Sequence, residues 1–146
     1  MRLVIQRVKK ARVLVNAQEV GAIEGGILVF LGVAKADTKA ETDQLVNKLV
    51  ELRIFDDQDG KMNLSAKDKN ASFLVVSQFT VLANADKGRR PSFDEAAPPS
   101  EAESLYEYFI EGLKKHQVRV ACGRFRAMMD VSLVNDGPVT FIMDSK

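Results

Sequence analysis

The stretch "GILVFLGVA", residues Gly26–Ala34, decides the fold. It is a continuous apolar run of strand length, and such a run without alternation is typical of a strand buried on both faces. We therefore predict a buried central strand here. A second strand-like run, "ASFLVVSQFTVLA" at 71–83, provides a neighbour of similar character.

Further strands are predicted on both sides of this pair. Upstream, "RLVIQRV" at 2–8 forms one strand, and the segment 11–26 forms two short strands around a polar turn at 16–19. Downstream, three more strands are predicted in "QVRVACG" (117–123), "RAMMDVSLVN" (126–135) and "PVTFIMD" (138–144).

Two helices are predicted from capping-box patterns, in which a Ser or Thr is followed three residues later by Glu. Thr38 with Glu41 begins the first helix, and Ser100 with Glu103 begins the second. Each has one apolar face at helical spacing. These faces comprise Leu45, Val46, Leu49, Val50 and Leu52 in the first helix, and Leu105, Phe109, Ile110 and Leu113 in the second.

Two segments are predicted to be irregular: the turn-rich connection "IFDDQDGKMNLS" at 54–65 and the long loop at 83–99. The whole pattern predicts one mixed sheet, curled on itself, with two helices packed against it. The order of elements alone is compatible with either an α/β or an α+β fold.

The composition is that of an ordinary globular protein: 146 residues, 46% hydrophobic and 28% charged, with a net charge of +1. We expect one domain spanning 1–146. The chain has neither an apolar run of membrane-spanning length nor a signal-like N-terminus, so a cytoplasmic location is expected. Basic residues cluster at 7–12 and 86–93, and exposed surface runs are the simplest interpretation of both clusters.

A single histidine, His116, and a single cysteine, Cys122, exclude several classes of function. They provide neither an internal disulfide nor a zinc cluster. No G-x-S-x-G motif accompanies His116 to suggest a serine hydrolase, and no phosphate-binding glycine motif opens a helix. We therefore expect no metal and no cofactor.

The stretch "VVSQFTV" (75–81) is the best candidate for chemistry. Polar residues alternate onto both faces of an otherwise apolar strand, so the strand is expected to stop near Ser77. Its end then leaves backbone donors near Gln78 and Phe79, suited to stabilising an oxyanion. A merely solvated strand end is the plain alternative. Thr80 as a nucleophile would need a base, and the neighbouring sequence offers none.

A second unusual stretch is "VNDGPVTF", residues Val134–Phe141. Its Asn, Asp and Gly are typical of a hairpin turn. Pro138, however, follows Gly137 directly and has no N–H for the strand ladder. The proline is therefore out of place in a simple hairpin.

Together these motifs resemble the D-aminoacyl-tRNA deacylases. The pairing of "SQFT" (77–80) with "NDGPVT" (135–140) carries the resemblance most strongly. Supporting motifs extend it over the whole chain: "IQRV" (5–8), "LGV" (31–33), "RIFDDQDGKMNLS" (53–65) and "KGRRPSF" (87–93). Their joint order and spacing make a chance match implausible.

The resemblance implies an α/β fold, in which a barrel-like mixed sheet carries two main helices, and a homodimer. It implies proofreading hydrolysis of D-aminoacyl-tRNA in translation, with aminoacylated tRNA as the partner. Catalytic residues would be Ser77, Gln78, Phe79 and Thr80, which line the pocket for the 3′-terminal adenosine.

In the same family, a Gly-cis-Pro element from one subunit enters the site of the other. Gly137 and Pro138 correspond to it, and they would exclude L-residues. The remaining implied positions are the pocket supports Arg7, Met129, Val139 and Thr140, and the tRNA phosphate contacts Lys87, Arg89 and Arg90. One departure is Arg126, where family members commonly have a small residue, and it leaves open whether Met128 or Met129 meets the adenine.

Chirality requires a clash against the wrong isomer, and fixed backbone carbonyls can provide it. A cis bond before proline would hold two neighbouring carbonyls parallel. Glycine has no Cβ to clash, so glycyl-tRNA is expected to be hydrolysed too. Two alternatives stay open: a dimeric RNA-binding module without catalysis, and an editing module that acts on L-aminoacyl esters.

Overall fold

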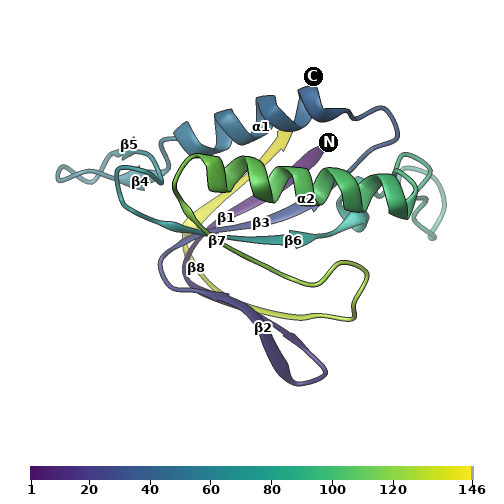
Figure 1. Cartoon of the computed structure of the whole chain (residues 1–146), viewed down its shortest axis with the longest axis horizontal. Helices are drawn as coiled ribbons and strands as arrows, with labels where there is room; N and C mark the ends of the chain where they lie inside the picture. Colours follow the sequence, from purple (N-terminus) through teal and green to yellow (C-terminus); the bar gives the residue numbers. More distant parts are fainter. Residues whose placement is uncertain (146) are drawn as a thin grey trace.

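The computed structural model describes residues 1–145, which form a mixed sheet with two helices on one face (Figure 1). The strand order is β2-β1-β3-β6-β7, and β8 pairs with β1 as well. The elements, in chain order, are β1 (Arg2–Val15), β2 (Gln18–Ile23), β3 (Gly26–Gly32), α1 (Lys39–Glu51), β4 (Phe55–Asp56), β5 (Met62–Leu64), β6 (Ser72–Ser77), the 3₁₀ helix η1 (Phe79–Leu82), α2 (Pro99–Lys115), β7 (Arg119–Cys122) and β8 (Asp130–Asp144).

The predicted central strand is confirmed as β3. It pairs antiparallel with β1 and parallel with β6, and β6 continues the parallel arrangement to β7. Side chains of β3 are buried on both faces, which explains its unbroken apolar sequence. One face packs on α1 and α2, and the other packs on a smaller cluster inside the curl that contains Val13, Leu28 and Val76.

The sheet is nearly closed, because its two ends approach each other. A Cβ on Gly21 of β2 would collide with the carbonyl oxygen of Cys122 on β7. Glycine is therefore required where β2 passes over β7. The predicted α/β fold with a barrel-like sheet is confirmed.

Three strand predictions were wrong in detail. Residues 2–15 form one strand instead of two, and the turn to β2 is made by Asn16 and Ala17, both with positive φ. The segments 126–135 and 138–144 are not separate strands, because β8 runs from Asp130 to Asp144 without a hairpin and residues 126–129 lie before it. The connection at 54–65 contains the short β4–β5 hairpin, which projects from the body of the molecule (Figure 1).

The first helix begins as predicted, with a full capping box between Thr38 and Glu41. The second does not. Helix α2 begins at Pro99, its N-cap is Pro98, and no side chain caps it. Proline at the first helical position already has a helical φ, which leaves Ser100 inside the first turn and unable to act as the cap.

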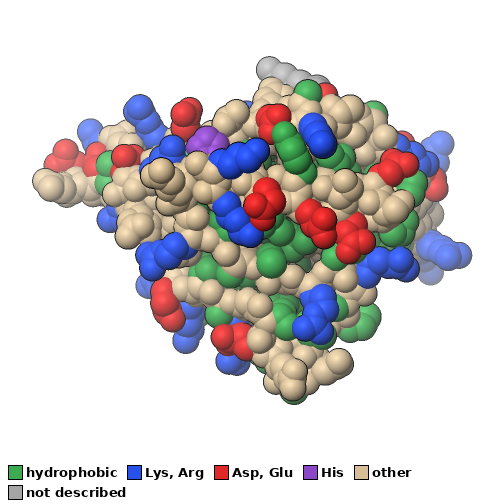
Figure 2. Space-filling view, viewed as in Figure 1, with side chains coloured by type: hydrophobic (Ala, Val, Ile, Leu, Met, Phe, Trp, Pro, Cys, Tyr) green, Lys and Arg blue, Asp and Glu red, His purple; other side chains and the backbone are tan. Residues whose placement is uncertain are grey.

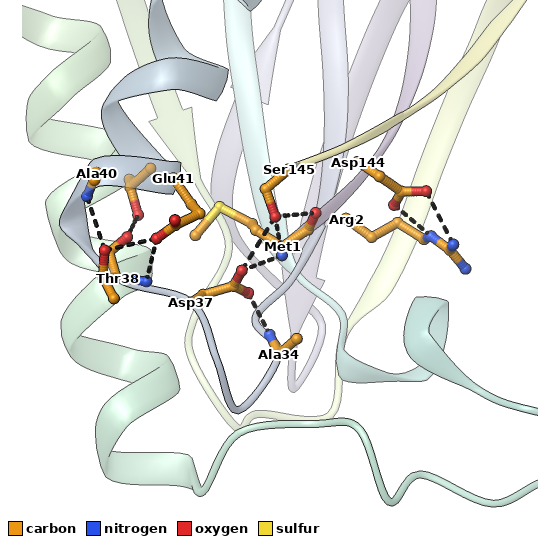
Figure 3. Close-up of polar contacts among 10 residues, drawn as sticks. Met1, Arg2, Ala34, Asp37, Thr38, Ala40, Glu41, Asp144 and Ser145 are labelled. Carbon is orange, nitrogen blue, oxygen red and sulfur yellow. Dashed lines mark hydrogen bonds and ion pairs between the residues drawn. The ribbon is translucent and has the colours of Figure 1, made fainter.

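A polar cluster at one corner joins both ends of the described chain to the sheet (Figure 3). The Met1 ammonium contacts the Asp37 carboxylate, and the Ser145 hydroxyl accepts from the same ammonium at 2.6 Å. Arg2 donates to Asp144 at 2.7 and 3.0 Å, and this hydrogen bonding lowers the pKa of Asp144. The start of β1 and the end of β8 are thereby fixed together. Within residues 1–145, no helix is long and apolar enough to cross a membrane.

Candidate functional site

The end of β6 lies where the sequence predicts it. The strand stops at Ser77, which stands opposite Leu31 of β3. The Gln78 N–H donates to the Leu31 carbonyl at 2.8 Å, so this donor is already used by the sheet. Phe79 then opens a 3₁₀ helix, whose first N–H groups have no partner within the helix. Of the two expected donors, the Phe79 N–H is the one left for a ligand.

A cavity of about 780 Å³ opens beside this strand end. It is lined by the end of β3, the end of β6 with the start of η1, the loop before α2 with the first turn of that helix, and the segment from Phe125 to Val131. Most of the lining side chains are apolar, and Figure 2 shows hydrophobic side chains in the band just below α2. The lining includes Leu31, Val33, Ser77, Gln78, Phe79, Phe93, Ala96, Ala97, Pro98, Pro99, Ala102, Phe125, Arg126, Ala127, Met128, Met129 and Val131.

The wall behind Ser77 is held from α2. The buried Tyr106 hydroxyl donates to the Val75 carbonyl at 3.0 Å, and the Gly123 N–H donates to the same oxygen at 3.0 Å. Burial raises the pKa of Tyr106, so its hydroxyl stays a neutral donor. The Tyr106 ring also packs against Phe125, with centroids 5.8 Å apart. Tyr106 therefore supports the wall without reaching the cavity.

The Thr80 hydroxyl is poorly placed to act as a nucleophile. Its Oγ1 accepts a hydrogen bond from the Gln78 amide at 2.5 Å, and Thr80 is absent from the residues that line the cavity within 1–145. An amide that donates to a hydroxyl oxygen cannot remove the hydroxyl proton. The mouth of the cavity is aromatic instead, with the rings of Phe79 and Phe93 meeting edge to face at 5.1 Å.

The two methionines differ in their anchoring. Met129 packs against the inner core cluster and lies close to Gly123, where an added Cβ would come within 2.7 Å of its sulfur. Met128 is 91% exposed at the rim. Arg126, the departure from the family pattern, has a positive φ of 59° and is exposed on the rim as well. Met129 is therefore the better-fixed side chain of the pair.

The residues Gly137 and Pro138 lie in a wide bulge of β8. Gln6 of β1 pairs with Thr140 and Val8 pairs with Asn135, so the segment 136–139 stands opposite Arg7 alone. A bulge is one of the few places where proline costs a sheet no hydrogen bond, which explains the proline that a hairpin could not accommodate. The Gly137–Pro138 peptide bond is cis.

Polar groups hold this bulge at its base. The Arg7 Nε donates to the Asp136 carbonyl at 3.0 Å. The Asn135 Nδ2 donates to the Arg7 carbonyl at 3.0 Å and to the Val139 carbonyl at 3.1 Å. Gly137 is so crowded that an added Cβ would collide with the Asn135 side chain. Arg7 and Val139 are buried, whereas Gly137, Pro138 and Thr140 are exposed.

The structure thus separates these predicted residues into three groups. Ser77, Gln78, Phe79 and Met129 surround the cavity, while Gly137 and Pro138 are absent from its lining within 1–145. Lys87, Arg89 and Arg90 form a third set at the exposed tip of the loop before α2, which is closed by paired bonds of 2.9 Å between Asn84 and Ser92.

Sequence reasoning missed four residues of the site: Phe93, Tyr106, Phe125 and Asn135. Phe93 and Asn135 lie inside motifs that were recognised, "KGRRPSF" and "NDGPVT", and so could have been included. Tyr106 and Phe125 had no signal beyond apolar character. Among residues 1–145, no group of three or more His, Cys, Asp or Glu side chains could hold a metal ion.

Comparison with known proteins gives one consistent family. Residues 4–144 match the family model described as D-Tyr-tRNA(Tyr) deacylase. The chain is 54% identical to a D-aminoacyl-tRNA deacylase of Thermotoga petrophila, over 99% of this chain and 97% of that protein. It is 57% identical to one of Geotalea uraniireducens, over 99% of this chain and 94% of that protein.

Solved structures agree in fold. The structure of a protein named "c-Myc DNA Unwinding Element Binding Protein" superposes with a TM-score of 0.94 at 41% identity and covers 100% of this chain and 99% of its own. A probable eukaryotic D-amino acid tRNA deacylase superposes with a TM-score of 0.85, covering 97% of both chains. At 17% identity, the latter supports the fold alone.

Proposed function

The chain belongs to the D-Tyr-tRNA(Tyr) deacylase family, and from this membership we propose that it hydrolyses the ester bond of D-aminoacyl-tRNA to release a free D-amino acid and tRNA. Such an activity would make it a proofreading enzyme of translation, acting in the cytoplasm as one domain. The full-length identity to D-aminoacyl-tRNA deacylases supports the reaction class.

The single observation that carries the mechanism is the end of β6 in the wall of an apolar cavity. An aminoacyl ester is already activated, so correct placement and one donor to the developing oxyanion suffice for hydrolysis. The Phe79 N–H supplies that donor, because the Gln78 N–H already donates to the Leu31 carbonyl. The rigid pairing of Ser77 with Leu31 supplies the placement.

The attacking water is oriented by the substrate. The 2′-hydroxyl of the terminal ribose lies beside the 3′-ester, and it takes the place of a protein base. A covalent role for Thr80 is disfavoured, because its hydroxyl accepts from Gln78 and has no acceptor for its proton among the described contacts. The anchored Met129, with Val131 beside it in the lining, would face the terminal adenosine.

Rejection of L-aminoacyl esters requires a second copy of the chain. Gly137 and Pro138 do not line the cavity of their own chain within 1–145, so we place them in the cavity of the partner subunit of a homodimer. Apolar side chains near the bulge support such an interface, since Phe141 is 38% and Ile142 is 65% exposed. Backbone carbonyls of the bulge would meet the Cβ of an L-residue, whereas Val139 and Thr140 secure the strand beyond it.

The basic loop tip gives the tRNA a contact outside the cavity. Lys87, Arg89 and Arg90 are exposed on the loop that leads into Phe93 at the cavity mouth. We expect their joint replacement by Ala to raise KM and to reduce its salt dependence, while the D-over-L ratio is unchanged. A change in that ratio would contradict the phosphate-contact role.

The decisive experiment compares D-Tyr-tRNA, L-Tyr-tRNA and Gly-tRNA as substrates of the purified protein. We expect hydrolysis of the D-ester and the glycyl ester and rejection of the L-ester. Equal rates on the D- and L-esters would overturn the stereochemical assignment. Saturable nucleic-acid binding without turnover would favour a binding module, an alternative suggested by the name of the 41% identical protein.

A further inference from the structure

The β4–β5 hairpin has no part in the proposed hydrolysis, yet its base contacts Arg7, the residue that holds the β8 bulge. It belongs to the motif "RIFDDQDGKMNLS", and it projects from the sheet as a separate arm (Figure 1). The contact between this arm and the body that matters here is made by the side chain of Arg7. The hairpin and the β8 bulge therefore share one guanidinium group.

Arg7 holds the two elements on different nitrogen atoms. Its Nη1 donates to the Ile54 carbonyl at 2.6 Å and contacts the Asp56 carboxylate at 3.3 Å. Its Nε donates to the Asp136 carbonyl at 3.0 Å and contacts the Asp136 carboxylate at 3.4 Å. A planar guanidinium has a fixed fork, so a hairpin that fixes one side of it also fixes the other. Arg7 is 7% exposed, which leaves it little room to rotate.

The hairpin is itself made rigid by Asp57. The Asp57 carboxylate accepts from the Asp59 N–H at 2.9 Å, from the Lys61 N–H at 3.0 Å and from the Asn63 amide at 2.7 Å. The turn is completed by Gly60, whose φ of +74° suits glycine. The Asp56 side chain therefore projects from a short, internally bonded hairpin, and its position opposite Arg7 is set by that hairpin.

We propose that Asp56 is a positioning residue for stereochemical selection: the hairpin orients Arg7 through Asp56, and Arg7 in turn holds the Gly137–Pro138 bulge in the position that excludes L-residues. The inference rests on the proposed function and extends it to a residue about 80 positions away in sequence. Within residues 1–145, Asp56 is absent from the cavity lining and its carboxylate contacts Arg7, so we expect its effect on the bulge to pass through Arg7.

The test replaces Asp56 by Ala and uses Asp59→Ala as the matched control. Both substitutions remove one carboxylate from the same hairpin, and the Asp59 side chain makes none of the contacts described at Arg7. We expect D56A to raise kcat/KM for L-Tyr-tRNA by about threefold to fivefold, the scale of one half-exposed ion pair. The rate on D-Tyr-tRNA stays within about twofold, because the wall of the cavity is untouched.

A double-substitution cycle tests the route. In an Arg7→Gln background, where the side chain cannot span the hairpin and the bulge, D56A should have no further effect on the D-over-L ratio. Conservative D56N retains an acceptor oxygen for Arg7 and should preserve most of the selectivity. If R7Q does not fold, the comparison of D56A with D59A in the native background carries the test.

Two outcomes would overturn the inference while the unaltered protein hydrolyses D-Tyr-tRNA. One is an unchanged D-over-L ratio in D56A, and the other is the same change of this ratio in D59A. Absence of any hydrolysis by the unaltered protein contradicts instead the proposed function, so the two failures are distinguishable.

Discussion

The cavity wall and the β8 bulge are built by different forces. Residues Phe73–Val76, which lead to Ser77, are completely buried apolar side chains at the centre of the sheet. The bulge is exposed, and it is held by Arg7, Asn135 and Asp136 through hydrogen bonds and charge. Packing tolerates changes of salt and pH, whereas polar contacts depend on each donor and acceptor. Substitutions in the cavity wall and substitutions in the bulge should therefore have separate effects, the first on hydrolysis and the second on the D-over-L ratio.

A substitution in the apolar wall should have the largest effect on the free energy of unfolding. Phe73→Ala removes a completely buried ring and is expected to lower the free energy of unfolding by about 3–5 kcal/mol. Urea denaturation measures this loss. Where the variant is still folded, the D-over-L ratio should equal that of the unaltered protein, because the bulge keeps all its contacts. A changed ratio would show that packing and selection are not separate.

Damage to the polar region should have a smaller effect on stability and a larger one on selection. Asn135→Ala leaves the carbonyls of Arg7 and Val139 without their donor, which costs about 1–3 kcal/mol. We expect the rate on L-Tyr-tRNA to rise as the bulge loosens. The control is Asn47→Ala, an exposed position on α1. The same stability and the same rate on L-Tyr-tRNA in both variants would show that Asn135 does not support the bulge.

The smallest expected effect is the loss of stability on changing Asp57, which lies in the hairpin that contacts Arg7. This loss depends on pH. Hydrogen bonds from the Lys61 N–H and the Asn63 amide lower the pKa of Asp57. A pKa lowered by folding contributes stability above the ordinary carboxyl value of about 4, and this contribution is lost as the pH falls through the folded-state value.

We expect the urea midpoint of the unaltered protein to fall below about pH 4. Asp57→Asn should have a lower midpoint at neutral pH and a flatter dependence in acid. Its cavity, and with it the rate on D-Tyr-tRNA, should be preserved. Identical pH profiles for the two proteins would show that Asp57 does not stabilise the hairpin.

Local patterns in the sequence predicted the apolar region better than the polar one. The burial of β3, the capping box of α1 and the end of β6 at Ser77 follow from composition and spacing over a few residues. The bulge could not be derived in this way, because its supports lie far apart: Arg7 reaches Ile54 and Asp136. "VNDGPVTF" has the composition of a turn, and only its pairing with β1 turns it into a bulge.

Helix α2 shows the same limit on a smaller scale. Ser100 and Glu103 match a capping box as well as Thr38 and Glu41 do. The two prolines before Ser100 instead set the first turn, and no side chain was needed to cap it. Tyr106 was overlooked for a related reason, since a periodic pattern does not indicate which inward side chain finds a polar partner.

The crowding around Gly137 has a consequence for how this protein can vary over evolutionary time. A methyl group there would meet the Asn135 side chain on one side and stand 2.7 Å from the Val139 backbone nitrogen on the other. A shorter residue at 135 would relieve only the first clash, because the second comes from the main chain. A substitution of a neighbouring side chain cannot remove the clash with the main chain, so a lineage that keeps the bulge keeps glycine at this position.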